Sequence, residues 1–182
     1  MFEGRDLSGE RFEDDDLCEE RFVRCTGSDV TFAHCDLSDV SFEGCDFVGA
    51  AFLSVDVAGT TWKNCRLLNA RFAELKGFDF EFVSSVLMYA DLREMNFSKR
   101  TLIEIDFSEA DLRGADFRDT VFERCRLSHA NIAGARFDGA DLRGADIGPF
   151  EDMKWLAALK GATISERQAH AVANALGIMV VG

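Results

Sequence analysis

The side chains best suited to metal binding or nucleophilic chemistry are six cysteines and three histidines. Structural zinc sites and thiol–imidazole catalytic pairs are usually built from Cys-x-x-Cys, paired histidines or His–Cys clusters, and none of these spacings occurs in the sequence. His34, His129 and His170 stand far apart along the chain. We therefore expect no metal site and no cofactor, and ordinary surface positions for the histidines.

Sequence motifs of enzyme active sites are missing as well. The sequence contains no Gly-x-Ser-x-Gly turn, no His-Glu-x-x-His helix and no glycine-rich loop of the kind that cradles phosphates. What stands out instead is 33 acidic residues against 20 basic ones, a formal net charge of −13. Such a chain repels nucleic-acid phosphates, which disfavours direct nucleic-acid binding. The sequence predicts a protein that is not an enzyme.

A five-residue period must position these acidic side chains. Every fifth residue from Phe2 to Ile147 is large and apolar at 28 of 30 positions. The residue two places earlier is usually Ala, Cys or Val, and the one between them is often Asp, as in Cys35-Asp36-Leu37. A period of five fits neither the 3.6 of a helix nor the 2.0 of a strand. The chain must therefore turn a corner in every repeat.

Four such repeats can close a square coil in which the large and the small residues both point inward. Residues 20 apart in the sequence then stack, and successive coils pair as a parallel β-ladder. Residues 2–147 provide about seven coils. At a ladder spacing of 4.7–4.9 Å, these coils predict a rod roughly 35 Å long.

This pattern resembles the pentapeptide-repeat family, whose motif is (Ala/Cys)-(Asp/Asn)-(Leu/Phe)-X-X. The stretches Ala110-Asp111-Leu112-Arg113-Gly114 and Ala140-Asp141-Leu142-Arg143-Gly144 match the motif directly. The resemblance covers about residues 2–148 and implies an all-β fold, a right-handed quadrilateral β-helix. We expect residues 1–148 to form this solenoid.

Five of the six cysteines occupy the small inward position, and Cys25, Cys45 and Cys65 fall in one column of adjacent coils. The ladder spacing lies within the Cα separation that a disulfide allows. The simpler interpretation is that Cys replaces Ala as a buried apolar residue in a reducing compartment. We favour free thiols.

Two stretches depart from the repeat. In the first coil, charged residues replace the small ones, which predicts a loose and irregular coil. Farther along, Gly77 takes a large position and Phe80 a small one, so inside and outside are locally exchanged. We expect a bulge or bend at this second stretch.

The C-terminal residues 149–182 form a different module in our interpretation. We expect a helix over 150–159, one stray repeat at 161–164, and a second helix that begins with a Ser165/Gln168 capping box and ends at Gly177. Its apolar residues could cap the last coil, as every solenoid requires, or also form a two-fold dimer. The residues expected to do so are Trp155, Leu156, Leu159, Leu176, Ile178 and Val180.

The negative charge is concentrated in the first coils and on one side of the square. Residues 1–56 carry 15 acidic and 4 basic side chains, whereas residues 57–148 carry 15 and 13. The side centred on Leu17, Leu37, Val57, Gly77, Phe97, Phe117 and Phe137, here called the acidic side, has a net charge of −6. Its acidic residues are Asp15, Asp16, Glu19, Asp36, Asp39, Asp56, Asp79, Asp116, Asp119 and Asp138. This side either binds a basic partner or only keeps the solenoid soluble.

The tail and the acidity are similar to those of mycobacterial-type pentapeptide proteins that act on DNA gyrase. That resemblance implies a homodimeric DNA mimic that binds DNA gyrase, a type II topoisomerase, inhibits or modulates it, and confers fluoroquinolone resistance. The alternative is a generic scaffold that binds another protein, for which Val48, Leu68 and Met88 form a candidate apolar column. Lacking a signal peptide and any apolar run of roughly 18 residues, the chain is expected to be cytoplasmic, without membrane contact.

Overall fold

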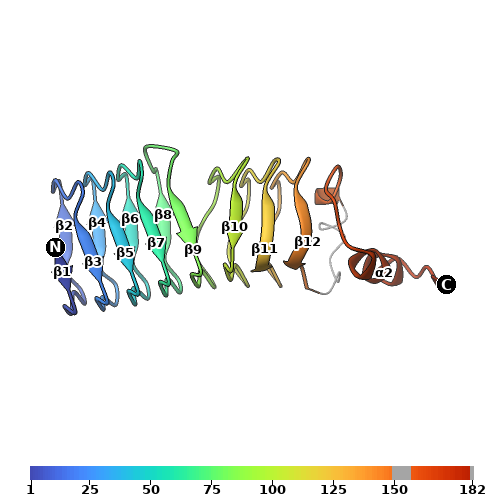
Figure 1. Ribbon diagram of the computed structural model, residues 1–182, viewed down its shortest axis with the longest axis horizontal. Helices are drawn as coiled ribbons and strands as arrows, with labels where there is room; N and C mark the ends of the chain where they lie inside the picture. The colour runs from blue at the N-terminus through green and yellow to red at the C-terminus, as the bar shows by residue number, and fades with distance from the viewer. Residues whose placement is uncertain (149–156, 181–182) are drawn as a thin grey trace.

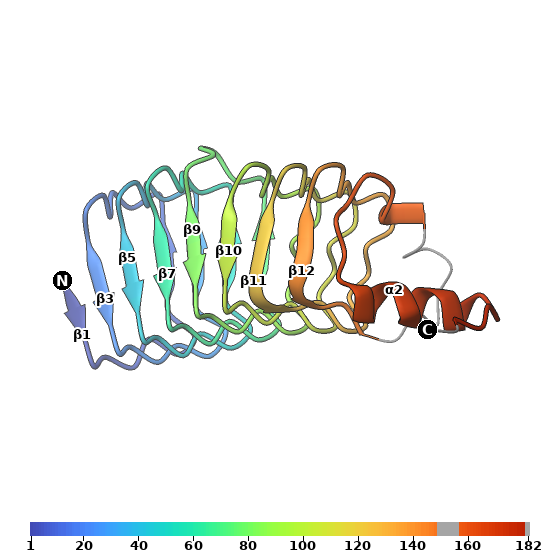
Figure 2. The same cartoon turned by 45° about the vertical axis from the view of Figure 1, so that its right-hand side comes forward.

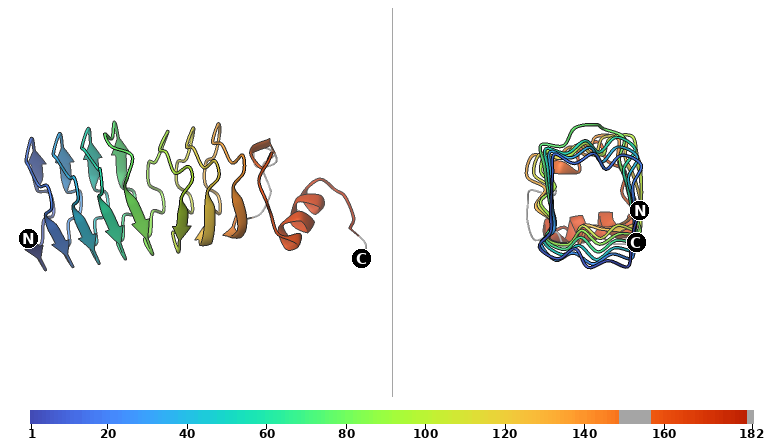
Figure 3. Two further views of the ribbon diagram at one scale, coloured as in Figure 1. Left: turned by 45° about the horizontal axis from the view of Figure 1, so that its top comes forward. Right: turned by 90° about the vertical axis from the view of Figure 1, so that its left-hand side faces the viewer.

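In a computed structural model that describes residues 1–148 and 157–180, the chain winds into a stack of similar coils. The stack is a straight rod with the N-terminus at one end and helix α2 (Glu166–Ala175) at the other (Figures 1 and 2). Viewed along the rod, the coils superimpose as a square (Figure 3). The predicted quadrilateral β-helix is therefore confirmed.

Parallel strands line two opposite sides of the square. The β1 side is an eight-stranded sheet of β1 (Phe2–Glu3), β3 (Arg21–Val23), β5 (Ser41–Glu43), β7 (Thr61–Lys63), β9 (Glu81–Val83), β10 (Thr101–Ile103), β11 (Val121–Arg126) and β12 (Asp141–Asp146). The β2 side has four strands, β2 (Arg11–Glu13), β4 (Thr31–Ala33), β6 (Ala51–Leu53) and β8 (Arg71–Ala73). Partners stand 20 residues apart, as in Phe22↔Phe42, which confirms the predicted stacking period.

The other two sides pair through single parallel bridges rather than strands. One of them, here called the bridge side, begins with Asp6↔Thr26, and the acidic side begins with Asp16↔Asp36. The β2 side changes to the same type after β8, where Asp91, Asp111 and Asn131 take the paired position. Each of these three residues accepts a hydrogen bond from the backbone N–H two residues ahead, as an Asx turn does. That local bond favours a turn over an extended strand.

Aromatic rings fill the interior of the N-terminal coils, residues 2–82. Rings on the β1 side stack on one another, as Phe22 does on Phe42 with centroids 4.9 Å apart. Rings on the β2 side do likewise, as between Phe32 and Phe52 at 5.2 Å. The two columns meet edge to face at the centre of the rod, where Phe22 and Phe32 lie 5.7 Å apart. Rings in such columns bury much apolar area and prefer these offset and edge geometries.

The C-terminal coils, residues 83–147, use a different interior. Leu102 and Leu112 occupy the β1 and β2 columns, and the stacked rings now stand on the acidic side, with Phe97 and Phe117 at 5.0 Å. Their edge partner is Phe107 from the bridge side, 5.8 Å from Phe97. The axis of aromatic packing has therefore turned by a quarter between the two parts of the rod.

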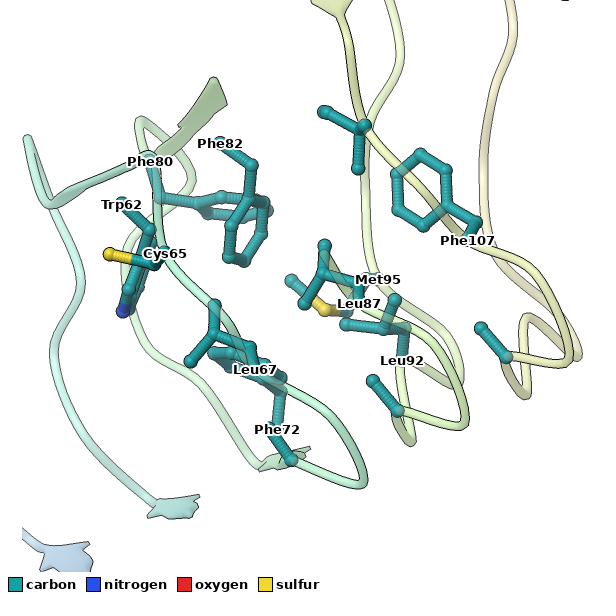
Figure 4. Close-up of a cluster of buried hydrophobic side chains, with 14 of the residues drawn as sticks. Trp62, Cys65, Leu67, Phe72, Phe80, Phe82, Leu87, Leu92, Met95 and Phe107 are labelled. Carbon is teal, nitrogen blue, oxygen red and sulfur yellow. The ribbon is translucent and has the colours of Figure 1, made fainter. Parts of the chain in front are cut away.

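The predicted irregularity at Gly77–Phe80 is confirmed, and it lies where this change occurs. The loop between β8 and β9 departs outward from the square outline (Figures 1 and 3). Gly77 has φ +77, and Phe80 is buried in the small position with its ring 5.8 Å from both Phe82 and Phe97. Phe80 thus connects the two aromatic systems, and Figure 4 shows it beside Phe82 at the end of the N-terminal core.

The first coil contradicts our expectation of an irregular one. It has the same strands, bridges and inter-coil hydrogen bonds as the later coils, for example Leu7 N to Thr26 O at 2.7 Å. Of the charged residues in its small positions, Arg5, Glu10 and Asp15 are exposed and Glu20 is half-buried and paired with the N-terminal amine, because the first coil has no neighbour on its outer face. Arg5 even places its guanidinium over the Phe2 ring, 5.1 Å from the centroid.

All six cysteines are free thiols, and the five in the small inward position are buried. The Cys45 thiol lies 3.3 Å from the carbonyl oxygen of Phe22 and the Cys65 thiol 3.3 Å from that of Phe42. Burial raises the pKa of the Cys125 thiol to about 11, because the thiolate would lose its hydration there. These residues act as small core side chains, as favoured from the sequence.

At the C-terminal end, residues 157–180 close the last coil. Thr163 forms a parallel bridge with Asp141, so the stray repeat at 161–164 does extend the ladder. Ser165 and Gln168 form the expected capping box of α2, and Gly177 has φ +72 after its end. Most of the helix expected over 150–159 lies outside the described residues, so the division at 148/149 stays a prediction.

Candidate partner-binding face

The ten acidic residues predicted for the acidic side all lie along one face of the rod. The bridges Asp16↔Asp36↔Asp56 and Asn96↔Asp116 hold this side in register over both parts of the rod. Eight of the ten are exposed, and Asp56 and Asp116 are half-buried. The fold therefore provides a continuous polar face with carboxylates at regular intervals.

Local hydrogen bonds fix the carboxylates of the first three coils. Asp16, Asp36 and Asp56 each accept a hydrogen bond from the backbone N–H two residues ahead, at 3.1, 2.9 and 3.0 Å. The Ser38 side chain and then its N–H hold the pKa of Asp36 below its usual value, because both favour the charged carboxylate. The ladder and the Asx turns together aim a column of anionic groups away from the core.

The net charge of the acidic side belongs entirely to these first coils. Residues 15–19, 35–39 and 55–59 contain six acidic side chains and no Lys or Arg. The same side of the later coils contains four of each sign. Arg118 binds Asp116 through Nε and Nη2 at 2.9 and 2.5 Å, and holds its pKa below the usual range. This agrees with the concentration of negative charge in residues 1–56 of the sequence.

Paired aspartates recur throughout the C-terminal coils. Three Asp-Leu-Arg stretches likewise place an arginine two residues after an aspartate. Each arginine donates hydrogen bonds to that aspartate from two guanidinium nitrogens. These pairs are Asp91–Arg93, Asp111–Arg113 and Asp141–Arg143, each with a closest contact of 2.6–2.7 Å. These ion pairs could have been predicted from the sequence, because an aspartate and an arginine two residues later lie on the same surface of the coil.

Two open hollows flank the irregular loop at the C-terminal end of the acidic column. One, of about 490 Å³, is lined by residues that include Phe80, Phe82, Phe97 and Arg100. The other, of about 290 Å³, is lined by residues that include Phe78 and Phe80. They exist because the coils separate here: β9 and β10 pair only through Val83↔Ile103, whereas β7 and β9 pair at three positions.

The residues predicted for the cap and the dimer divide into three groups. Trp155 and Leu156 lie outside the described residues. Leu159 packs against the core, whereas Leu176, Ile178 and Val180 are exposed by 45%, 54% and 47%. Sequence reasoning gave Gln168 only its role in the capping box. Gln168 is 5% exposed, and its side-chain amide nitrogen also donates to Leu142 O and Ala145 O at 2.9 Å, and so satisfies carbonyl groups of the last coil.

The other predicted surface positions follow the repeat. Val48, Leu68 and Met88 form a half-buried column on the bridge side, beside the exposed Tyr89. His34 and His129 are exposed at corners with positive φ. His170 is exposed on α2, with Nδ1 2.9 Å from Glu166 O.

Over residues 1–148 and 157–180, no group of three or more His, Cys, Asp or Glu side chains is arranged to hold a metal ion. Across the same ranges, no helix has the length and hydropathy needed to cross a membrane.

Comparison with known proteins agrees with this geometry. The family model "Pentapeptide repeats" matches residues 28–61 and 105–144 with eight copies. No curated protein matches the chain. A solved structure of trypsin-treated QnrB1, described as a plasmid-mediated fluoroquinolone resistance protein, has a TM-score of 0.76 at 20% identity, with 99% of each chain covered. A second trypsin-treated QnrB1 structure has a TM-score of 0.60 at 18% identity, covering 98% of this chain and 100% of that one.

These matches establish the repeat and the fold. The chain is a quadrilateral β-helix with pentapeptide repeats over residues 28–61 and 105–144, as its sequence indicated. The family model leaves out residues 1–27 and 62–104, which contain the charged small positions and the irregular loop. The coils nevertheless continue through both stretches.

Proposed function

We propose that this protein mimics DNA, binds DNA gyrase through its acidic side, inhibits or modulates the enzyme and thereby confers fluoroquinolone resistance. The observation that carries the proposal is the column of unpaired carboxylates in the first three coils. Duplex DNA presents about one negative charge per 1.7 Å of its axis to a basic DNA-binding surface. A rod with regularly spaced, outward-facing carboxylates presents a similar row of negative charges to the same surface. The common fold with QnrB1, a fluoroquinolone resistance protein by its description, supports the proposal.

Because the charge is unevenly distributed, the two halves of the acidic side would contribute differently to binding. The six unpaired acids of residues 15–59 would contact the basic surface first, because long-range attraction depends on net charge. On the acidic side of the later coils, four basic side chains offset the four acidic ones and Arg118 already holds Asp116, so these carboxylates would add little. In this proposal the N-terminal half of the acidic side is the main footprint.

The test is a gyrase supercoiling assay titrated with purified protein, with and without a fluoroquinolone. The triple variant Asp16→Asn/Asp36→Asn/Asp56→Asn should lose most of the effect on gyrase, since the amide oxygen can still accept the Asx hydrogen bond while the charge is gone. The matched control is Asp116→Asn/Asp119→Asn/Asp138→Asn, which should lose less. Wild-type protein without effect on supercoiling or on drug-stabilised cleavage at micromolar concentration would refute the proposal.

We also propose that two copies associate through the C-terminal residues. Leu176, Ile178 and Val180 are exposed on and after α2, and apolar groups gathered at one end of a molecule favour a two-fold contact. Sedimentation should give a dimer for the wild type and a monomer for Ile178→Asp/Val180→Asp. A monomeric wild type would restrict these residues to capping.

The alternative is a scaffold that binds another protein through the bridge side, and it is favoured by the half-buried column Val48, Leu68 and Met88. Added salt separates the two proposals. Binding through the acidic side should weaken steeply as salt rises, whereas binding through this apolar column should not.

A further inference from the structure

The irregular loop contains two residues that each break the repeat and that compensate one another. Phe80 and Arg100 occupy the small position in adjacent coils of the same column. The Arg100 guanidinium lies over the Phe80 ring, 4.7 Å from its centroid, and donates hydrogen bonds to the carbonyl oxygens of Phe78 and Phe80. Among the described residues no bridge joins Lys76 to Asn96, so the ladder of the acidic side is interrupted here.

This arrangement holds Phe78 in solvent. Its side chain is 75% exposed, whereas Phe80, two residues later, is 4% exposed. The backbone around it is fixed by Arg100, by the left-handed Gly77 and by a hydrogen bond of 2.6 Å from Gly59 N to Asp79 O. An exposed aromatic side chain on a constrained backbone loses little conformational freedom when a partner covers it.

Nothing in the packing of the rod requires an aromatic residue at this position. Neighbouring coils of the acidic side have Ser38, Ala58, Ser98 and Arg118 in the equivalent place. The core at the transition is filled by Phe80, so Phe78 contributes no stacked ring to it. A local departure from an otherwise consistent repeat, with no structural gain, is typical of a functional position.

Phe78 also continues the acidic column. The Asp56 carboxylate lies so close to Gly77 that a Cβ at that position would be 2.8 Å from Asp56 Oδ1. Asp79 follows Phe78 directly and is exposed. A partner that covers the six unpaired carboxylates of residues 15–59 therefore reaches Phe78 at the end of the same face.

We propose that Phe78 is the aromatic anchor of this face and inserts into an apolar pocket on the basic surface of the protein that the acidic side binds, with Arg100 as the residue that positions it. This inference rests on the proposed function, and the partner is DNA gyrase. An aromatic residue that fills a desolvated pocket can carry a large share of the binding energy, while the contacts around it exclude water. The carboxylates bring the partner to this face, and Phe78 fixes where along the rod it stops.

The experiment measures the affinity of purified gyrase for wild-type protein and for Phe78→Ala, Phe78→Gln and Tyr89→Ala. Tyr89 is the matched control, because it is an exposed aromatic residue, 52% exposed, on the opposite side of the rod. Phe78→Ala and Phe78→Gln should weaken binding by about 10-fold or more, as expected for an aromatic hot spot. Tyr89→Ala should bind as the wild type does. The salt dependence of binding should persist in every variant, because no charge has changed.

A double-mutant cycle tests the positioning role of Arg100. Arg100→Ala should weaken binding in the wild-type background and have no further effect in Phe78→Ala, because it acts by holding Phe78. An equal loss in both backgrounds would overturn this role. Thermal midpoints of each variant identify unfolded protein, and Arg100→Lys replaces Arg100→Ala in the cycle if the latter does not fold.

The outcomes separate the two proposals. If the wild type binds gyrase and the affinities of both Phe78 variants lie within about twofold of the wild-type affinity, the proposal that Phe78 is an anchor is wrong and the acidic-side proposal stands. If wild type does not bind gyrase at all, both fail.

Discussion

The N-terminal and C-terminal coils solve the same packing problem in different ways. In residues 2–82 the rings meet across the β1 and β2 sides, as with Phe22 and Phe32, whereas in the later coils they meet across the acidic and bridge sides, as with Phe97 and Phe107. The surfaces differ in parallel, because Asp36 is bound only by its own turn and Asp116 is held by Arg118. The same five-residue repeat is therefore compatible with two arrangements of core rings and with either free or arginine-paired aspartates on the surface.

The difference teaches how a narrow interior limits its side chains. Opposite sides of the square share a fixed width, so a column of rings on one pair of sides leaves room for mostly smaller residues on the other pair, with single rings such as Phe47 and Phe122 as exceptions. The change from one arrangement to the other needs a transition. Gly77 leaves the large position of the acidic side without a side chain, and Phe80 places a buried ring in the small position that follows it. The hollows and the exposed Phe78 are consequences of that transition.

A large loss of stability is expected from a substitution at the transition itself. Phe80→Ala should destabilise the protein by about 3 kcal/mol, because it removes a buried ring that packs against Phe82 and Phe97. Urea unfolding at pH 7 measures the change. Phe117→Ala, within the regular C-terminal stack, is the matched control and should cost about as much or more. A negligible effect of Phe80→Ala would mean that the two aromatic systems do not need a connection.

A smaller effect is expected at the capped end. Gln168→Ala should destabilise by about 2 kcal/mol, since it leaves the carbonyl oxygens of Leu142 and Ala145 without their buried donor. Hydrogen exchange should become faster in β12 and stay unchanged in β1, because each coil contacts only its neighbours. Equal acceleration at both ends would instead indicate that the rod unfolds as one cooperative unit.

The smallest effect concerns the paired aspartates. Arg113 holds the folded-state pKa of Asp111 below its unfolded value, so the pair stabilises the fold above the unfolded pKa of about 4 and that contribution is lost as pH falls through the folded pKa. Asp111→Asn should therefore lower stability by about 0.5 kcal/mol at pH 7, after solvent screening. The difference from wild type should disappear at lower pH. Unfolding midpoints at pH 7 and at pH 2 provide the comparison, and a difference that persists at pH 2 would exclude the ion pair as its source.

Several features of this protein could be predicted from particular residues. The unbroken phase from Phe2 to Ile147 predicted the coil, its stacking period and the buried cysteines, because no other backbone path keeps such residues on one side. The Ser165/Gln168 pair and Gly177 predicted both ends of α2, because capping depends on local hydrogen bonds. The first coil was predicted wrongly, since charges at an open end reach water without disturbing the ladder.

The sequence by itself determined the repeat, the four-sided coil and the uneven distribution of charge, because these depend on residue spacing along the chain. The tertiary structure turned the aromatic packing by a quarter at Phe80. It also decided that Phe80 is buried while Phe78 is exposed. These outcomes depend on contacts between residues about 20 apart, such as Arg100 with Phe80, where each residue alone breaks the pattern and only their stacking in space makes the pair compatible with the fold.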